Sequence, residues 1–232
     1  MEQTRAMLYA ERLSRLIQIE TISAKGQTDR SKFYQFHGAL REMFPNLFAV
    51  CEFEDFNGSF LLRWKGRTDA APVMLMNHHD VVEASGEWAY PPFSGAIAEG
   101  KVWGRGTLDT KGGLWAMLQA ADELAAEGFV PRQDTYFVSA CTEECDGSGG
   151  DMISKELFRR GIRFAMVLDE GGMILEEPIG GARGNLIQCI DHFDDAIQDA
   201  LGQHQTQIAG SSIQRGGDEG IVHTAGGRTA AT

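Results

Sequence analysis

A short, wholly apolar run at residues 72–77 constrains the fold of this chain more than any other feature. Its letters are PVMLMN, and a run of this length without polar alternation is typical of a strand buried on both faces. Further strands are predicted at 135–140 and 164–168, with helices at 111–128 and 150–160 between the strands. This alternation of strands and helices predicts an α/β fold with a mostly parallel central sheet.

The part of the chain before this run is predicted to add two helices and two strands. Apolar residues recur at helical spacing over 5–19 and 31–44, and strand-like runs follow at 47–53 and 59–64. An Asn-Gly dipeptide between the two strand-like runs is typical of a tight hairpin turn.

The end of the chain differs in composition, and we place a domain boundary near Gly184. Residues 185–232 contain six glutamines, as many as the 184 residues before them, and no Lys, Trp, Tyr or Pro. Residues 1–184 are therefore interpreted as one domain and 185–232 as an atypical, poorly ordered tail. A frameshift or a miscalled gene model would explain such a change, and translating the other reading frames would test this hypothesis.

Charge and cysteine content argue against several classes of protein. Lys and Arg number 21 and Asp and Glu 33, which gives a net charge of −12 and disfavours non-specific binding to nucleic acid or anionic membranes. The four cysteines form no CxxC pair, no apolar stretch approaches ~18 residues, and the start does not resemble a signal peptide. We therefore expect reduced thiols, a cytoplasmic location, and neither nucleic-acid nor membrane partners.

Four polar segments each lie where a predicted strand ends: NHHDVV, GRGTLDTKGG, CTEECDGSGG and MVLDEGG. The carboxyl ends of parallel strands line the ligand crevice of α/β sheets. In the first segment, His78 and Asp80 point the same way in extended chain, while His79 faces away. Asp80 is thus placed to hold the second ring nitrogen of a metal-bound His78. A polar loop with two surface histidines is the alternative.

The other three segments supply carboxylates. Asp109 lies in a glycine-rich turn, where it could bridge two cations, but capping of the following helix explains it as well. A phosphate-binding loop is a weaker alternative, because the spacing fits neither GxGxxG nor a P-loop. Glu143 and Glu144 repel one another unless a cation or proton separates them. Surface Glu pairs are nevertheless common, and Asp169 could be an ordinary turn residue.

Taken together, the four segments offer one histidine and several carboxylates at strand ends. Such a mixed set of nitrogen and oxygen ligands suits zinc or a related divalent ion.

At these residues the chain resembles the dizinc aminoacylase and carboxypeptidase family. This family includes carboxypeptidase S, aminoacylase, acetylornithine deacetylase and succinyl-diaminopimelate desuccinylase. The resemblance runs from about Glu20 to Arg183 and is carried by HHDVV, WxxPPFSG, GRGTLDTKGG, TEE and VLDEGG. SFLLRWKG at 59–66 and the VLDEGG form resemble the carboxypeptidase S branch best. Residues 1–184 then correspond to the N-terminal part of a zinc-peptidase catalytic domain with a three-layer α/β sandwich.

The resemblance implies a role for each site residue. His78 and Asp169 would hold one zinc, Glu144 would hold a second, and Asp109 would bridge the two. Asp80 would orient His78, and Glu143 would act as general base toward a metal-bound water. The peptide bond after Asp109 is often cis in this family. The expected reaction is hydrolysis of a small peptide or N-acyl amino acid, which releases an amino acid.

The chain departs from the family pattern in two respects. It contains no recognisable lid and dimerisation domain, and no returning segment with the second zinc-binding histidine. His192, His204 and His223 do not lie in a family-like context. The alternative hypothesis is therefore a truncated, non-catalytic fragment that binds at most one metal or serves as an interaction module. A related dizinc aminopeptidase is a third possibility, which PPFSG and VLDEGG disfavour. The homodimer typical of the family is not expected without its dimerisation domain.

Overall fold

The computed structural model describes residues 2–169 without a break and, after them, the segments 173–176, 185–188, 213–214, 221–224 and 228–230. The chain forms two compact units, Met1–Leu168 and Asp169–Thr232. No helix in the described part of the chain is long and apolar enough to cross a membrane. The first unit contains every predicted site residue except Asp169.

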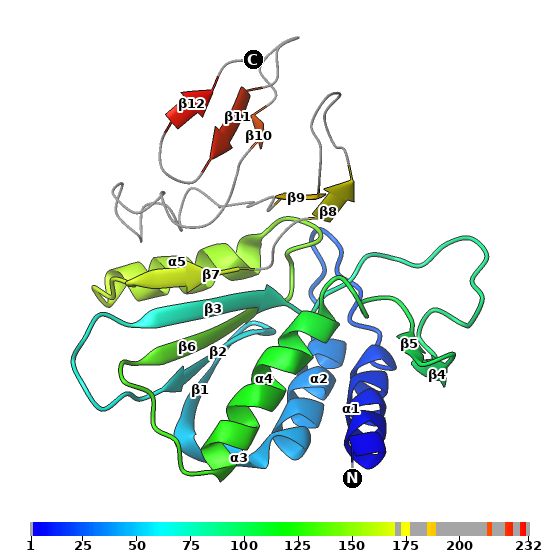
Figure 1. Cartoon of the computed structure of the whole chain (residues 1–232), viewed down its shortest axis with the longest axis horizontal. Coiled ribbons are helices and arrows are strands. Elements are labelled where there is room, and N and C mark those ends of the chain that lie inside the picture. Colours follow the sequence, from blue (N-terminus) through cyan, green and yellow to red (C-terminus); the bar gives the residue numbers. More distant parts are fainter. Residues whose placement is uncertain are drawn as a thin grey trace. The chain divides into compact units, whose positions relative to one another are not determined.

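Five helices and seven strands build the first unit (Figure 1). The helices are α1 (Glu2–Ile17), α2 (Ser31–Met43), α3 (Pro45–Val50), α4 (Lys111–Ala126) and α5 (Ser148–Arg159). The strands are β1 (Cys51–Phe56), β2 (Ser59–Trp64), β3 (Val73–His78), β4 (Ala96–Ala98), β5 (Lys101–Trp103), β6 (Thr135–Ala140) and β7 (Met166–Leu168).

The central sheet has the strand order β1-β2-β6-β3-β7. β3 runs parallel to both β6 and β7, while β2 is antiparallel to β6 and to β1. Four of the five strands therefore point the same way, and only β2 is reversed. The predicted mostly parallel sheet is confirmed. The short β4–β5 hairpin forms a separate two-stranded sheet.

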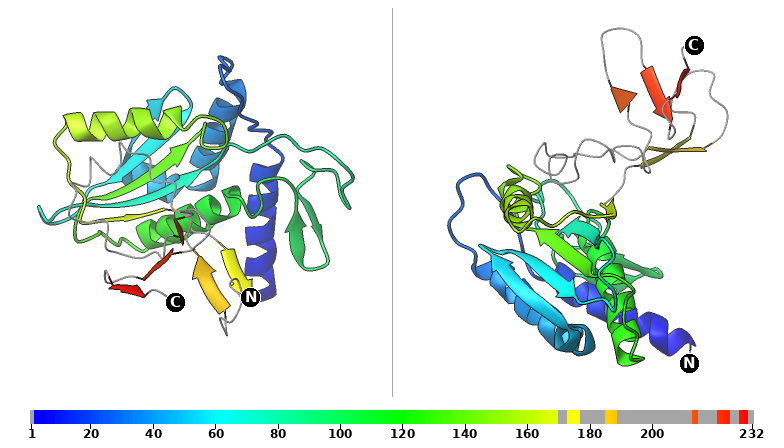
Figure 2. Two further views of the ribbon diagram at one scale, coloured as in Figure 1. Left: turned by 90° about the horizontal axis from the view of Figure 1, so that it is seen from above. Right: turned by 90° about the vertical axis from the view of Figure 1, so that its left-hand side faces the viewer.

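Helices cover both faces of this sheet and give three layers (Figures 1 and 2). The main core lies between α1–α4 and one face, to which β2 contributes Phe60, Leu62 and Trp64. Leu61 is also fully buried and, because side chains alternate along a strand, faces the opposite side. There α5 packs against the sheet and buries Ile153. The predicted three-layer α/β fold is thus confirmed.

Residues 47–53, predicted as a strand, are divided between a helix and a strand. α3 covers Pro45–Val50, and β1 follows it directly. Pro45 suits the first turn of a helix, where its missing N–H would have no intrahelical partner. Leu47 is fully buried, and its N–H donates to Asp122 Oδ1 of α4 at 2.9 Å. Contacts from a distant helix therefore fix the conformation of this segment.

The second unit contains short antiparallel strands. β8 (Met173–Glu176) pairs with β9 (Asn185–Gln188), and β11 (Ile221–Thr224) lies between β10 (Ile213–Gln214) and β12 (Arg228–Ala230). The predicted boundary at Gly184 lies outside the described residues, as do His192 and His204.

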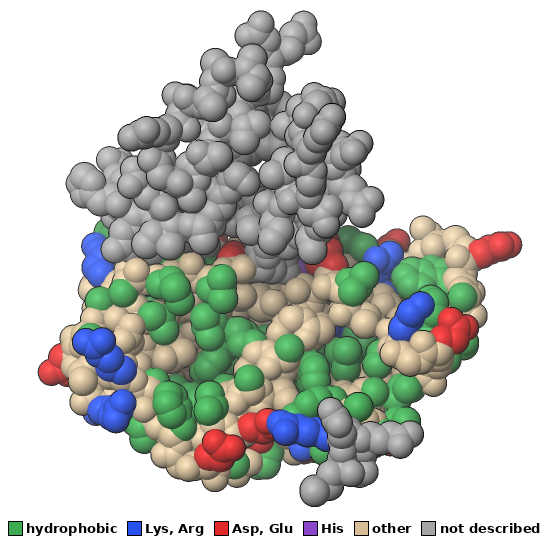
Figure 3. All heavy atoms as spheres, in the orientation of Figure 1, with side chains coloured by type: hydrophobic (Ala, Val, Ile, Leu, Met, Phe, Trp, Pro, Cys, Tyr) green, Lys and Arg blue, Asp and Glu red, His purple; other side chains and the backbone are tan. Residues whose placement is uncertain are grey.

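On the face of the first unit drawn in Figure 3, basic and acidic side chains are interspersed among apolar ones. The described residues on that face form no continuous basic patch.

Gly112, in the first turn of α4, fits tightly against the glycine-rich loop before this helix. A Cβ atom here would lie 2.2 Å from the carbonyl oxygen of Thr107. Overpacking against backbone costs about 1–3 kcal/mol, so we expect Gly112→Ala to lower the free energy of unfolding by about this amount. Urea denaturation followed by circular dichroism measures the change.

Gly38 of α2 provides the matched control. A Cβ atom there would meet nothing within 4 Å. Gly38→Ala is therefore expected to raise the free energy of unfolding by up to about 1 kcal/mol, the usual helix-propensity gain. The tight fit of Gly112 would be refuted if both variants were equally stabilised.

Candidate metal centre

The predicted site residues meet at one edge of the sheet because β3 and β6 end together. His78 is the last residue of β3 and pairs with Ala140, the last residue of β6. The pairing continues for one more residue, since the N–H of His79 donates to the carbonyl of Ala140 at 3.0 Å. The segment after β3 thus lies beside residues 141–144, which follow β6.

Three of the four predicted metal ligands form a cluster at this edge. His78, Asp109 and Glu144 each offer one ligand atom, and these atoms lie within 4.8 Å of one another. The His78 side chain is 2% exposed, whereas that of Asp109 is 69% exposed. The cluster therefore has a rigid, buried side and a side open to solvent. One imidazole nitrogen and two carboxylates form a donor set that fits zinc.

The orientation of His78 turns the ring nitrogen that could bind a metal toward the cluster. Its Nδ1 lies 3.0 Å from the backbone carbonyl of Asp80, which can only accept, so Nδ1 carries a proton. Nε2 faces the cluster, 3.0 Å from Asp109 Oδ1. A divalent ion would take the place of any proton on Nε2. A carbonyl that fixes the tautomer in this way is typical of histidine ligands.

Asp80 contacts more of the site than the predicted role of orienting His78 requires. It is fully buried, and Oδ1 lies 3.4 Å from His78 Nδ1. The same carboxylate accepts hydrogen bonds from the backbone N–H groups of Glu143, at 3.2 Å, and Glu144, at 3.0 Å. It therefore ties the segment after β6 to the segment after β3. The orientation of His78 comes from both the carbonyl and the carboxylate of this residue.

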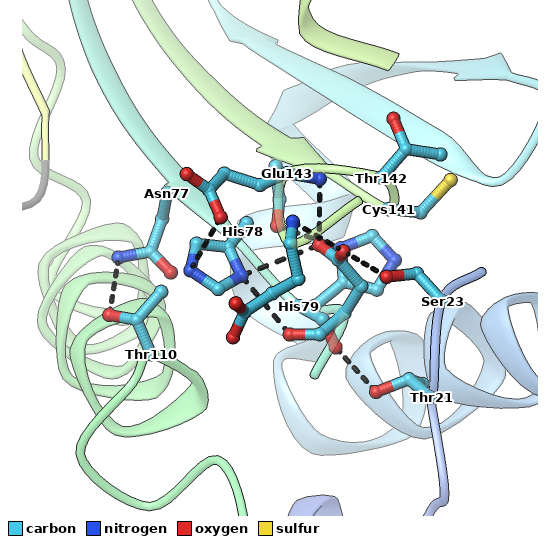
Figure 4. A network of polar contacts seen from close by, with 12 residues as sticks. Thr21, Ser23, Asn77, His78, His79, Thr110, Cys141, Thr142 and Glu143 are labelled. Atoms are coloured by element: carbon cyan, nitrogen blue, oxygen red, sulfur yellow. Dashed lines mark hydrogen bonds and ion pairs between the residues drawn. The ribbon is translucent and has the colours of Figure 1, made fainter. Parts of the chain in front are cut away.

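Two residues near the N-terminus, Thr21 and Ser23, form hydrogen bonds to the same edge of the sheet, and the sequence did not predict these contacts. Ser23 donates to Asp80 Oδ2 at 2.7 Å, and Thr21 donates to the carbonyl of His79 (Figure 4). The N–H of Val81 also donates to the carbonyl of Thr21 at 3.0 Å. Nothing in the local pattern around these residues predicts a contact with a strand end almost sixty residues away.

We expect Asp80→Asn to weaken zinc binding by about 10- to 100-fold, as for other residues that orient a ligand. The Asp80 carboxylate accepts hydrogen bonds through two oxygens, whereas an asparagine side chain has only one. Its NH₂ group would face a backbone N–H, and two donors cannot form a hydrogen bond with each other. Isothermal titration calorimetry measures the affinity. Asp55→Asn is a matched control, because Asp55 also accepts two backbone N–H bonds but lies on β1 and is not one of the clustered residues. Equal zinc affinity in both variants would contradict the role of Asp80.

His79 faces away from the cluster, as predicted. Its ring stacks on Phe36 with centroids 4.9 Å apart, and Nδ1 lies 2.8 Å from Ser139 Oγ. Complete burial lowers the pKa of His79 well below its usual value. This side chain therefore belongs to the core and stays neutral.

Lys111 is a second buried group that the sequence analysis did not single out. It is fully buried, and Nζ donates to the carbonyls of Leu16, at 3.2 Å, and Ile19, at 2.6 Å. Burial lowers the pKa of Lys111 to about 7. The side chain ties the end of α1 to the start of α4, two residues after Asp109.

The two carboxylates of the cluster differ in proton affinity. The hydrogen bond from His78 lowers the pKa of Asp109. Burial, with the nearby Asp109 charge as second cause, raises the pKa of Glu144 to about 7. A cation bound between the two carboxylates would favour the charged form of both and so relieve the part of the shift that comes from their mutual repulsion.

Zinc affinity is expected to fall as the pH drops below about 7. Glu144 must lose its proton before it can bind a cation, and its pKa of about 7 means that the protonated fraction grows as the pH falls through this value. Glu144→Gln should bind zinc more weakly above about pH 7 and show a shallower pH dependence. Competition with a chromophoric chelator at several pH values measures both. Identical slopes for the two proteins would contradict the prediction.

The remaining predicted residues differ in placement. Glu143 lies at the cluster, with Oε2 3.7 Å from His78 Nε2 (Figure 4). Asp169 follows β7 directly and is half-buried, and it is the first residue of the second unit. Its role as a ligand stays a prediction. The peptide bond between Asp109 and Thr110 is cis, which confirms that expectation.

Sequence comparison matches residues 74–215 to the family model described as peptidase family M20/M25/M40. The chain is 35% identical to "Probable carboxypeptidase S-like 2" of Dictyostelium discoideum over 73% of this chain and 35% of that protein. It is 33% identical to the human "N-fatty-acyl-amino acid synthase/hydrolase PM20D1" over 72% of this chain and 34% of the human protein. Yeast carboxypeptidase S is 32% identical, with 72% and 32% covered. The chain thus spans about a third of the length of these relatives.

Solved structures share the fold. Human carnosine dipeptidase 1 has a TM-score of 0.58 at 17% identity, covering 74% of this chain and 40% of that one. The M20 family metallo-carboxypeptidase Sso-CP2 from Sulfolobus solfataricus also has a TM-score of 0.58, at 22% identity, covering 72% and 38%.

Proposed function

Because the chain belongs to peptidase family M20/M25/M40, we propose that it carries the metal site of a zinc-dependent hydrolase that cleaves an amide bond and releases an amino acid. The observation that carries this proposal is the cluster of His78, Asp109 and Glu144 with Glu143 beside it. The chain spans about a third of its relatives, so the activity of the whole protein belongs to this proposal.

His78, Asp109 and Glu144 would hold zinc, with Asp169 as a further ligand. The fit rests on the donor set and on the orientation of His78, whose Nδ1 faces the Asp80 carbonyl so that Nε2 points toward the cluster. Bound there, zinc acts as a Lewis acid that makes a water molecule more acidic and a carbonyl carbon more electrophilic. The crowded carboxylates would favour such a cation over protons at neutral pH.

Glu143 is the proposed general base. Its carboxylate would accept a proton from the attacking water and later deliver it to the leaving nitrogen of the amide. The Asp80 carboxylate holds the backbone N–H of Glu143, and this bond fixes the base relative to His78. Base and ligands are therefore positioned by one buried group.

The proposed substrate is a small peptide or an N-acyl amino acid with a free carboxylate. The names of the relatives support this, because a carboxypeptidase and an N-fatty-acyl-amino acid hydrolase both act on an amide beside a carboxylate. The two substrate types differ in the group on the carbonyl side of the amide, which is a peptide in one and a fatty acyl chain in the other. The proposal covers the part that they share, an amino acid with a free carboxylate joined through its nitrogen.

A second candidate function is a metal-binding module without catalysis. The observation in its favour is that only three ligand atoms converge within the described part of the chain. Such a module would bind one zinc ion and hydrolyse nothing.

The two functions are separated by assaying release of free amino acid from N-acetyl and long-chain N-acyl amino acids and from dipeptides. The proposal predicts turnover by the zinc-loaded chain that a chelator abolishes and zinc restores. Turnover that persists in chelator would refute it. Tight zinc binding without turnover would select the second function.

A further inference from the structure

Lys111 lies in the first turn of α4, yet its ammonium group hydrogen-bonds to the end of a different helix. Nζ donates to the carbonyls of Leu16, at 3.2 Å, and Ile19, at 2.6 Å, and lies 5.4 Å from the ring centroid of Phe36. α1 ends at Ile17, and the last carbonyls of a helix have no intrahelical N–H partner. A cation at this end of a helix is also favourable. The buried lysine therefore caps α1 and fixes it against the start of α4.

The segment that follows α1 connects this lysine to the proposed metal centre. The carbonyl of Ile19 accepts hydrogen bonds both from Lys111 Nζ and from the N–H of Thr21, the latter at 2.9 Å. Two residues later, Ser23 donates to the buried carboxylate of Asp80 at 2.7 Å. A continuous hydrogen-bonded segment thus runs from Lys111 to the residue that orients His78.

The aliphatic part of Lys111 contacts the glycine-rich loop on the other side of the metal centre. Gly106 has a φ of +88°, and a Cβ atom there would lie 2.8 Å from Val81 Cγ1 and 3.2 Å from Lys111 Cδ. A larger residue would displace one of these side chains, so glycine is required for this close approach. Asp109 lies between Gly106 and Lys111 in the chain. The proposed ligand is therefore held from both sides of this short stretch.

Packing alone does not account for a lysine at this position. Lys111 is fully buried, and burial of a charged group costs free energy that an apolar side chain of similar length would not incur. An apolar side chain, however, could not form the two directional bonds to the end of α1. In some proteins buried polar groups fix one arrangement of neighbouring segments in this way.

We propose that Lys111 is a positioning residue that fixes the two halves of the metal centre relative to one another. One half is Asp109, just before α4, and the other is His78 with Asp80, at the end of β3. Lys111 acts on the first through the start of α4 and Gly106, and on the second through residues 19–23. This inference rests on the proposed function, because a zinc ion held by His78 and Asp109 would contact both halves.

Lys111→Met tests this assignment, because methionine keeps most of the aliphatic stem and removes the donors to α1. We expect about 10- to 100-fold weaker zinc binding, the usual range for residues that orient a metal ligand. Competition with a chromophoric chelator measures the affinity. The cobalt-loaded variant should also show shifted d–d absorption bands, which report the arrangement of the ligands and not the stability of the fold. Lys111→Gln should lose less affinity, since its amide can still donate to one carbonyl.

Asp122→Ala is the matched control on the same helix. Asp122 is also buried, and its carboxylate accepts hydrogen bonds from the N–H of Leu47, at 2.9 Å, and from Asn46 Nδ2, at 3.1 Å, near the other end of α4. This variant should lower Tm as Lys111→Met does but keep the zinc affinity and the cobalt spectrum of the wild type. Lys111→Gln takes the place of Lys111→Met in the comparison if the methionine variant does not fold.

Ser23→Ala tests the route through residues 19–23. Because Ser23 supports Asp80 from the segment that Lys111 holds, loss of both groups should weaken zinc binding less than the product of the two separate losses. The losses in an Asp122→Ala, Ser23→Ala double variant should multiply. Simple multiplication for Lys111 and Ser23 as well would overturn the proposed route.

The assignment is overturned if a folded Lys111 variant binds zinc like the wild type, or if Asp122→Ala weakens zinc binding as much as Lys111→Met. The proposed function can fail separately. A zinc-loaded wild type that hydrolyses nothing would refute the hydrolase, while weaker zinc binding in Lys111→Met alone would still support the role of Lys111. Hydrolysis by the wild type with unchanged zinc affinity in Lys111→Met would support the hydrolase and overturn this role.

Discussion

Glu143→Ala is expected to lower the hydrolysis rate of N-acyl amino acids by about 100- to 10,000-fold, the usual contribution of a general base. Zinc affinity should stay nearly unchanged, because the three clustered ligand atoms belong to other residues. The effect should fall on kcat, since the proton moves during the chemical step and not during binding. Initial rates with saturating substrate, together with zinc content, measure both quantities.

Glu11→Ala is the control for this variant, because Glu11 is an exposed glutamate on α1, outside the metal centre. It should retain the full rate. Glu143→Gln should behave like Glu143→Ala, since the amide keeps the size of the side chain but accepts no proton at neutral pH. Turnover in either Glu143 variant at the wild-type rate would remove this residue as the base.

Asp109→Asn is expected to weaken zinc binding more than 100-fold, above the range of about 10- to 100-fold seen for residues that only orient a ligand. The substitution keeps the shape of the side chain and removes the negative charge that faces His78 Nε2. Because the Asp109 side chain is 69% exposed, little change in folding is expected. Calorimetric titration of the metal-free protein with zinc gives the affinity.

Asp69→Asn removes the same charge from an exposed position in the loop between β2 and β3 and should bind zinc like the wild type. The comparison separates ligation from the general attraction of an acidic chain, whose net charge is −12, for cations. An Asp109→Asn variant with the affinity of Asp69→Asn would show that Asp109 holds no metal.

The sequence was sufficient to predict the sheet and the edge where the site residues gather. The apolar run at 72–77 correctly predicts the strand β3, although most of its residues are half-buried and not buried on both faces as predicted. Chemistry in parallel sheets gathers where such strands end. His78 and Glu144 are 66 positions apart in the chain, yet both follow from this rule. The cis bond after Asp109 came from the resemblance and not from the pattern of residues.

What the sequence could not predict depends on contacts between distant segments. The helix at Pro45–Val50 is held by a hydrogen bond to Asp122 of α4, and its apolar sequence is also compatible with a strand. Ser23 supports Asp80 from a loop with no recognisable motif.

Asp80 illustrates why the site is more than a set of ligands. A two-residue spacing predicts that it orients His78, but its carboxylate also holds the backbone of both glutamates that follow β6. The proposed base Glu143, the ligand Glu144 and the imidazole of His78 are thereby all positioned by one buried carboxylate. Loss of Asp80 should therefore disturb metal binding and proton transfer together.

The most direct test of the central claim, that His78, Asp109 and Glu144 form a zinc site, is the metal content of the purified chain after zinc loading and gel filtration. We predict at least one zinc ion retained per chain in the wild type and loss of that ion in His78→Ala. A wild-type chain that retains no zinc, or a His78→Ala variant that retains as much as the wild type, would contradict the claim.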